Sequence, residues 1–483
     1  MVPFGHWHPD AAALNAPLVT VAKNCLPSPQ GFRPLKAPAA SGGGLPGRCL
    51  GAVTVLKGDG SVVSFAGTAT GLFRAEGDGS WTDVSRVADP YTTPAGERWH
   101  FAVFGDNLIA TNFNDVVQVL DMSDEDAKFD ALGGSPPKAR YIAVVREFVL
   151  LGCLENNETA VQWCSVGNSG EWTPGLNSGD LQVFPANGPV RGLVGGEVGY
   201  AFQAQAVSRM IFAPGSDEVF QFDEVEGVRG LAGPSSLVRL AREAFYFAGD
   251  GFYRFDLVSG ASQPIGVGKW ARWFQGDLRA GTELEILSAV SPQERGVLFP
   301  YISRGNSGTV PDRVLIYDWS IDEATFAEIT TEAAAAWLTQ GYTLDTMNAF
   351  GTLDELPYSL DAPFWKGGAP QLAVFDGQHR IGYLQGAVMR AEFETADGQG
   401  EQRVLIKATR PHIDTADVTV SVAMRERDSD PVTFPTHERM EDTGEVPAWA
   451  SGNIARAHIV IDKGSDWTYA KGIKTLLGRA GRR

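Results

Sequence analysis

Histidines and carboxylates are the residues of this chain whose types could carry catalysis or bind a metal, and few of them are spaced for it. His6 and His8, one residue apart, could hold a metal ion from two sides. A structural zinc site needs four ligands, so two histidines on one segment do not predict one. The sequence has no H-E-x-x-H motif, no P-loop and no G-x-S-x-G elbow. We therefore expect neither a metal nor a cofactor.

Paired carboxylates would be needed for glycoside hydrolysis. Residues 77–81 resemble the Asp-box of sialidases, but Glu76 stands where that box has Ser or Thr, and Ser80 where it has Gly. The acidic residues Asp223, Glu224 and Glu226 read as a solvated strand end, because nothing in their spacing separates an acid from a base. The sequence thus predicts a protein that is not an enzyme.

The composition indicates a folded protein rich in turns. The chain has 483 residues, with 56 glycines, 28 prolines and 43% hydrophobic residues, which argues against a helical bundle and against disorder. The net charge of −18 disfavours condensation on DNA phosphates. No stretch approaches the roughly 18 apolar residues of a membrane span, and the first residues lack the features of a signal peptide. We expect synthesis in a cytoplasm, with four unpaired cysteines, Cys25, Cys49, Cys153 and Cys164.

Short apolar runs separated by Gly, Asp and Asn recur along the middle of the chain. Residues 53–56, 62–66, 71–74 and 81–84 form four such runs, the size of one propeller blade. Comparable turns follow at intervals of 39 to 51 residues, at Asn107, Arg146, Glu197, Glu243 and Glu294. This period predicts an all-β fold, with a β-propeller of about six to seven four-stranded blades over residues 49–386. Stacked β-sandwiches are the alternative.

Two segments near the end of the propeller have their own patterns. Thr330 or Thr331 could cap a helix over residues 332–338, ended by Gly341. Residues 371–384 predict a hairpin that could close the ring.

The two ends of the chain differ from the middle. Residues 1–48 are rich in Pro, Ala and Gly and predict an extended N-terminal arm, whose removal should leave the propeller folded. Residues 387–470 alternate as antiparallel strands and predict a small β-sandwich-like domain, followed by a basic tail over residues 471–483. Large aromatics and cations on these ends are the candidate interface residues, namely Phe4, Trp7, Phe32, Lys471, Lys474, Arg479, Arg482 and Arg483.

Several segments resemble a known family. Residues 4–10 (FGHWHPD), 22–27 (AKNCLP) and 31–34 (GFRP) resemble the opening of structural proteins of short-tailed phages and related prophages. Further similar segments, over roughly the first 385 residues, are 139–146, 220–225, 250–253 and 353–361. In its layout the chain is also similar to the packaged-DNA stabilisation proteins, which form the hub or nozzle of the short tail.

The resemblance implies a structural virion protein located in the tail and made in the cytoplasm of a bacterial host. It implies a homo-oligomeric ring of six copies below an adaptor protein, holding a tail fibre, tailspike or needle protein. The ring would close the exit channel and let double-stranded DNA pass without tight binding. Two other functions stay open at this point, a carbohydrate-active β-propeller enzyme and a monomeric propeller binding module.

Overall fold

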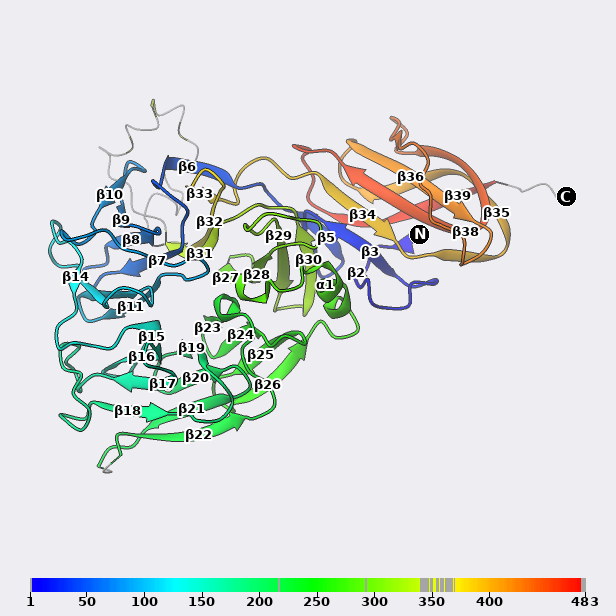
Figure 1. Ribbon diagram of the computed structural model, residues 1–483. Coiled ribbons are helices and arrows are strands. Elements are labelled where there is room, and N and C mark those ends of the chain that lie inside the picture. The colour runs from blue at the N-terminus through cyan, green and yellow to red at the C-terminus, as the bar shows by residue number, and fades with distance from the viewer. Residues whose placement is uncertain are drawn as a thin grey trace.

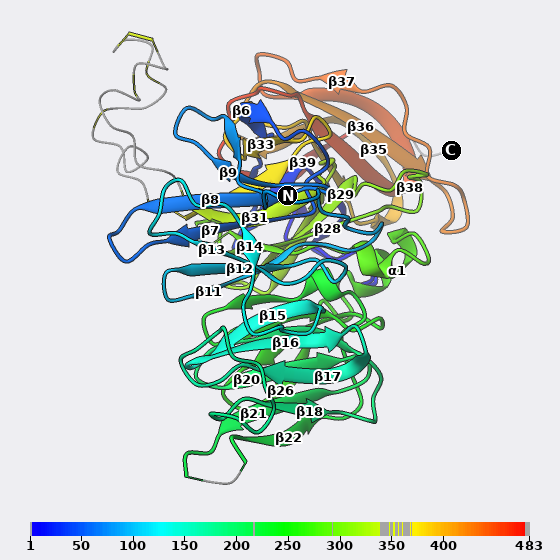
Figure 2. The same ribbon diagram turned by 60° about the vertical axis from the view of Figure 1, so that its left-hand side comes forward.

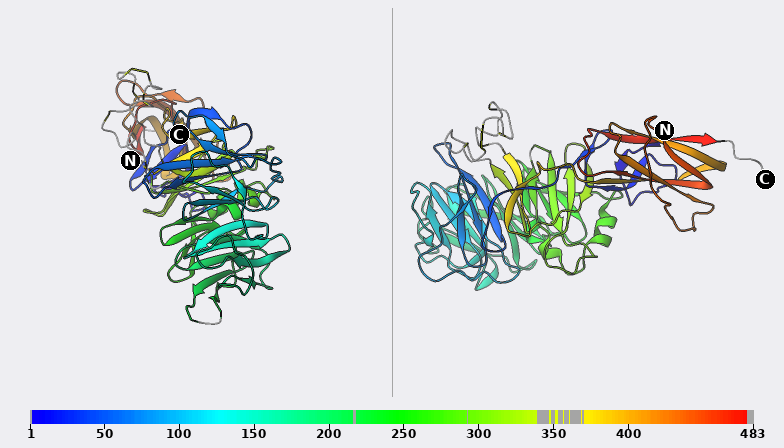
Figure 3. Two further views of the ribbon diagram at one scale, coloured as in Figure 1. Left: turned by 90° about the vertical axis from the view of Figure 1, so that its left-hand side faces the viewer. Right: turned by 90° about the horizontal axis from the view of Figure 1, so that it is seen from above.

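The computed structural model shows an all-β chain with two connected parts, a β-propeller and a second β unit (Figure 1). It describes residues 2–215, 218–291, 293–338 and 370–478, together with residues 347, 351, 352, 356, 360 and 368. Seen from above, the second unit extends from one side of the propeller (Figure 3). The α-helix whose bounds the structure gives is α1 (Ala271–Asp277), and the 3-10 turns are η1 (Pro234–Ser236) and η2 (Glu283–Glu285).

Six four-stranded antiparallel sheets are separate blades of the propeller, and five of them are consecutive in the chain. In Figure 2 the sheets from β7 to β22 follow one another along the side turned to the viewer. Blade 1 contains β7 (Gly51–Leu56), β8 (Val62–Gly67), β9 (Leu72–Ala75) and β10 (Trp81–Asp83). Blade 2 contains β11 (His100–Phe104), β12 (Asn107–Thr111), β13 (Gln118–Asp121) and β14 (Asp130–Ala131). Blade 3 contains β15 (Ala139–Val145), β16 (Phe148–Leu154), β17 (Asn157–Trp163) and β18 (Asp180–Val183). Blade 4 contains β19 (Val190–Val194), β20 (Gly199–Gln203), β21 (Val207–Phe212) and β22 (Phe220–Glu226). Blade 5 contains β23 (Val238–Leu240), β24 (Glu243–Phe247), β25 (Phe252–Asp256) and β26 (Ala261–Ile265).

Blade 6 is continuous with the second unit. Its strands are β27 (Ala289–Ser291), β28 (Gly296–Tyr301), β29 (Arg313–Asp318) and β30 (Glu323–Ala327), and β30 adjoins β3 (Leu18–Lys23) in one fifteen-stranded sheet. The first strand of blade 6 contacts those of blades 5 and 7, so seven four-stranded units surround the axis. The predicted propeller of about six to seven blades is confirmed.

The last blade joins the two ends of the propeller sequence. Blade 7 contains β31 (Ala333–Leu338), β32 (Pro370–Phe375) and β33 (Arg380–Tyr383), and its outer strand is β6 (Ala39–Gly44). The predicted helix over residues 332–338 is wrong, because this run is β31, paired residue by residue with β32. Alanine has a high helix propensity, but tertiary pairing outweighs such a local preference.

The second unit combines strands from both ends of the chain. Its C-terminal strands are β34 (Ala391–Thr395), β35 (Gly398–Ile413), β36 (Val418–Arg425), β37 (Glu438–Arg439), β38 (Val446–Ile461) and β39 (Ala470–Gly478). The N-terminal strands β1 (Val2–Pro3), β2 (His6–Trp7), β3, β4 (Cys25–Ser28) and β5 (Gly31–Pro34) belong to the same sheet. The prediction of an extended arm over residues 1–48 is therefore wrong, because β3 pairs with β34. The boundary at residue 470 is also wrong, because β39 runs to Gly478.

Candidate functional site

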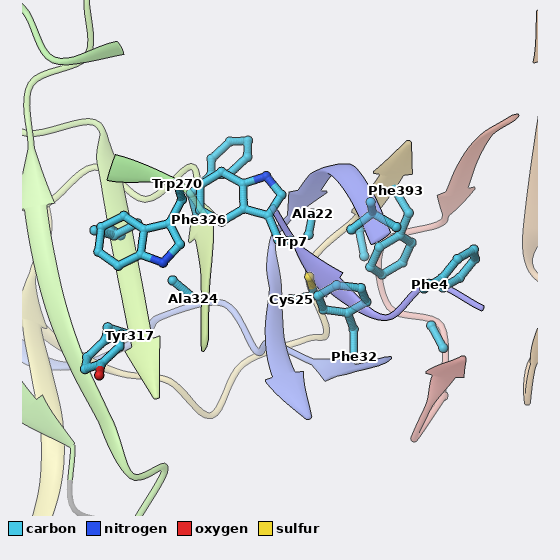
Figure 4. Close-up of a cluster of buried hydrophobic side chains, with 14 of the residues drawn as sticks. Phe4, Trp7, Ala22, Cys25, Phe32, Trp270, Tyr317, Ala324, Phe326 and Phe393 are labelled. Carbon is cyan, nitrogen blue, oxygen red and sulfur yellow. The ribbon is translucent and has the colours of Figure 1, made fainter. Parts of the chain in front are cut away.

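The aromatic side chains predicted to anchor a neighbour are buried in this chain's own core. Phe4 and Trp7 are 0% exposed and Phe32 is 1% exposed (Figure 4). The rings of Phe4 and Phe32 lie 5.4 and 5.1 Å from the ring of Phe393, and Trp7 meets Trp273 edge-on at 4.7 Å. Their prediction as interface residues is corrected: the strands that carry them pair within the chain, so these rings serve its core.

The His6 and His8 pair faces a carboxylate already held by a cation. Nε2 of His8 lies 2.8 Å from Oε2 of Glu323, and Nζ of Lys269 lies 3.0 Å from Oε1 of the same carboxylate. Burial alone would raise the pKa of Glu323, but the hydrogen bonds from His8 and Lys269 outweigh it and lower that pKa. Within the described part of the chain, no three His, Cys, Asp or Glu side chains are grouped to hold a metal ion. The cluster fixes the N-terminal segment to blade 6.

The axis of the propeller contains two cavities of about 350 and 430 Å³ lined by the first strands of the blades. Arg98 and His100, just before and at the start of β11, border the first cavity. The Arg98 guanidinium lies 3.7 Å from the Glu285 carboxylate and 3.4 Å from the carbonyl oxygen of Glu332. Burial lowers the pKa of His100 to about 4, so this imidazole is neutral at pH 7.

Other arginines near the axis connect blades. Arg140 on β15 donates to both carboxylate oxygens of Glu97, at 2.9 and 3.1 Å. Arg191 on β19 donates to the carbonyl oxygens of Leu231 and Ala232, at 3.1 and 3.3 Å, and Arg239 on β23 donates to that of Gly195. These arginines therefore connect neighbouring blades around the axis.

A buried carboxylate secures the seam where the propeller closes. Glu332 is 3% exposed, and its Oε2 accepts hydrogen bonds from the His379 imidazole and from the backbone N–H of Cys49. Cys49 lies between β6 and β7, and His379 lies in the turn before β33. This cluster cannot be predicted from the sequence, since its members are separated by up to 330 residues and form no motif.

Negative charge is concentrated on blades 1 and 2. Residues 51–135 contain thirteen acidic and five basic side chains. Their net charge of −8 accounts for eight of the 18 excess negative charges of the chain. In each of these two antiparallel sheets, the turn between the first and second strands and the turn between the third and fourth strands lie at the same end of the sheet. We call this end the acidic edge; its carboxylates are Asp59, Glu76, Asp78, Asp106, Asp121, Asp124, Glu125 and Asp126.

Three turns of the acidic edge have the same hydrogen-bond pattern. Asp59, Asp78 and Asp121 each accept hydrogen bonds from the hydroxyl (2.6 Å) and backbone N–H of the serine two residues later. These bonds lower the pKa of each carboxyl group, with the serine hydroxyl as the main cause. These three carboxylates are therefore charged at neutral pH.

Two of the five predicted basic residues of the tail lie in a strand. Lys471 and Lys474 belong to β39, so the prediction of a tail beginning at residue 471 is wrong. Arg479, Arg482 and Arg483 lie outside the described residues. The ammonium group of Lys471 lies over the ring of Tyr469, 4.5 Å from its centroid.

An apolar pocket of about 350 Å³ opens beside β39. At its rim Arg456 donates to both oxygens of Asp397, at 2.8 and 2.9 Å, and Arg425 lies 2.6 Å from the same carboxylate. These contacts lower the pKa of Asp397 despite its partial burial. The pocket thus has apolar walls and a rim of paired charges.

Known proteins similar to this chain are found among solved structures. No family model and no curated protein matches the chain. The similar solved structures include the extracellular domain of a putative one-component system from B. thetaiotaomicron, at 10% identity and TM-score 0.43. That alignment covers 84% of this chain but 48% of the other, so the chain spans about half its length.

Two further similar structures are shorter. The β-propeller domain of Myceliophteria thermophila Cps50 (Swd1) is 11% identical over 71% of this chain and 98% of its own, with a TM-score of 0.42. BBS1N, solved in complex with ARL6DN, is 9% identical over 73% of this chain and 98% of its own, with a TM-score of 0.41. No helix in the described part of the chain is long and apolar enough to span a membrane.

Proposed function

We propose that this chain is a structural, non-catalytic subunit of a short-tailed phage tail, a nozzle or hub ring around the DNA exit channel. The proposal starts from the resemblance of residues 4–10, 22–27 and 31–34 to the opening of such proteins. The observation that carries it further is the acidic edge of blades 1 and 2. Duplex DNA leaving a particle needs a wall that does not bind phosphate, and exposed carboxylates repel it over about 10 Å at ordinary salt.

The connection between the two parts of the chain supports a load-bearing role. Blade 6 and the second unit share one sheet, and the aromatic core around Trp7 and Phe326 spans their junction (Figure 4). A continuous sheet and a common core resist bending between the parts. Such a subunit can hold an adaptor at one end and a fibre, tailspike or needle at the other, in a ring of six copies.

The decisive experiment locates the chain in native particles by electron microscopy with an antibody against it. We expect a ring at the tail tip, with the acidic edge facing the lumen. Absence of the chain from purified virions would overturn the proposal.

DNA binding tests the role of the acidic edge separately. The wild-type protein should bind labelled duplex negligibly at about 50 mM salt. The triple variant Asp124→Lys, Glu125→Lys and Asp126→Lys should bind it, with an affinity that falls steeply with salt. A matched triple reversal on the second unit, Glu438→Lys, Glu441→Lys and Asp442→Lys, should not confer comparable binding if the edge is the relevant surface.

A further inference from the structure

Strand β39 has one edge that is only partly covered. On that side β1 pairs with its first half, where Val2 lies opposite Ile473 and the N–H of Phe4 donates to the carbonyl of Lys471 at 2.9 Å. On the other side β35 pairs with β39 as far as Gly478. No described strand pairs with residues 474–478 on the β1 side.

The uncovered half presents backbone groups in the right register for another strand. In an antiparallel ladder, the N–H and C=O groups of alternate residues point to the same side. Those of Lys471 and Ile473 point toward β1, so those of Thr475 and Leu477 point to the uncovered edge. An unpaired row of this kind is a template for strand addition.

One face of this edge is apolar. Ile473, Thr475 and Leu477 line the pocket beside β39, together with Val404, Ile406 and Val422. Leu477 is 62% exposed, although it points to the same face as the buried Ile473. A strand placed beside β39 would direct every second side chain into this pocket.

The opposite face of the same edge carries an unpaired cation. Lys474 lies directly across from Arg410, on the same face of the sheet. Like charges opposite each other destabilise a sheet, and here Glu445 compensates only Arg410, at 2.9 Å. Lys474 is exposed and has no ion-pair partner in the described part of the chain.

We propose that the edge of β39 from Lys474 to Gly478 accepts an extended segment of a neighbouring protein as an added strand, in line with β1. The pocket takes apolar side chains and Lys474 takes a carboxylate, so the segment alternates apolar and acidic residues. This inference is independent of the proposed tail function, since it rests on the sheet edge alone.

Two labelled nine-residue peptides serve as probes, one alternating valine with glutamate and one alternating valine with lysine. Fluorescence anisotropy with the full chain at about 50 mM salt should show saturable binding of the valine–glutamate peptide and at least tenfold weaker binding of the valine–lysine peptide. Absence of saturable binding, or equal binding of both peptides, would overturn the proposal.

Two variants test the two features of the edge. Thr475→Pro removes one outward N–H at a position where an edge strand tolerates proline, and it should abolish binding while leaving the thermal transition in place. Lys474→Glu should reverse the preference toward the valine–lysine peptide, whereas the exposed propeller variant Lys128→Glu should leave it unchanged. If Thr475→Pro binds like wild type, or Lys474→Glu keeps the original preference, the assignment is wrong. The proposal would also be overturned if the chain forms a concentration-dependent dimer that the Thr475→Pro variant does not form, because the edge would then bind a second copy of this chain.

Discussion

Oε2 of Glu332 lies 2.8 Å from Nδ1 of His379, across the seam where the first and last parts of the propeller sequence meet. The same oxygen accepts the N–H of Cys49 at 3.3 Å. A single buried carboxylate thus joins blade 7 to the segment that leads into blade 1.

Replacing this carboxylate should destabilise the protein without changing its fold. Glu332→Ala leaves a buried N–H and an imidazole without their acceptor, which costs about 2 kcal/mol. Chemical unfolding followed by tryptophan fluorescence measures the change. The exposed variant Glu441→Ala is the control and should stay within about 0.5 kcal/mol of wild type. Equal stability of both variants would show that the seam does not depend on Glu332.

Trp7 should be one of the most sensitive positions of the chain, despite its place near the N-terminus. Trp7→Ala empties a fully buried site beside Trp273 and Phe326 and should cost about 3–5 kcal/mol. Trp449 is 70% exposed, so Trp449→Ala is the matched control with little expected effect. A small shift of the unfolding midpoint for Trp7→Ala would mean that the N-terminal strands are dispensable.

Stability should fall in mild acid, partly through His100. Its pKa is about 4 in the folded chain against 6.5 for an ordinary histidine, so the unfolded state binds the proton first as the pH drops. Above pH 6.5 protonation of His100 does not affect the free energy of unfolding. Below pH 6.5 it lowers this free energy progressively, by roughly 3 kcal/mol near pH 4. His100→Phe keeps a ring against Tyr141 and should flatten this dependence in urea midpoints measured between pH 7.5 and pH 4.5. An unchanged slope would contradict the assignment.

The four cysteines should be free thiols that react slowly. All four are unpaired and buried, and burial raises the pKa of Cys49 to about 12. Alkylation without reductant, read by mass spectrometry, should modify four residues after unfolding and few in the native protein. A mass corresponding to a protected Cys153 and Cys164 pair would disprove this.

The propeller could be predicted from the sequence because its signals are local. Turns such as Gly58-Asp59-Gly60 separate strands that pair with their immediate neighbours, so strand and turn rhythm marks each blade. The helix expected over residues 332–338 fails for the converse reason: its alanines pair with β32, more than 30 residues away.

The N-terminal strands could not be predicted in this way. Val19 pairs with Thr395, and Ala39 pairs with Tyr383, at separations that no local pattern reports. Buried Phe4, Trp7 and Phe32 look like exposed anchors until those distant strands are in place. The chemistry of Glu332 and Asp397 was missed for the same reason, since each meets its partners only through the fold.

The pairing of β6 with β33 also determines when the protein can fold during synthesis. The ribosome makes residues 39–44 more than 330 residues before their partners at 380–383. Val2 likewise cannot pair until Ile473 has been made. Until then blade 7 has an open edge, and such edges favour aggregation of the nascent chain. Contacts this distant also slow folding. Strand β6 therefore stays without its partner until residues 380–383 have been made, and a chain truncated before them would lack the strand that completes blade 7.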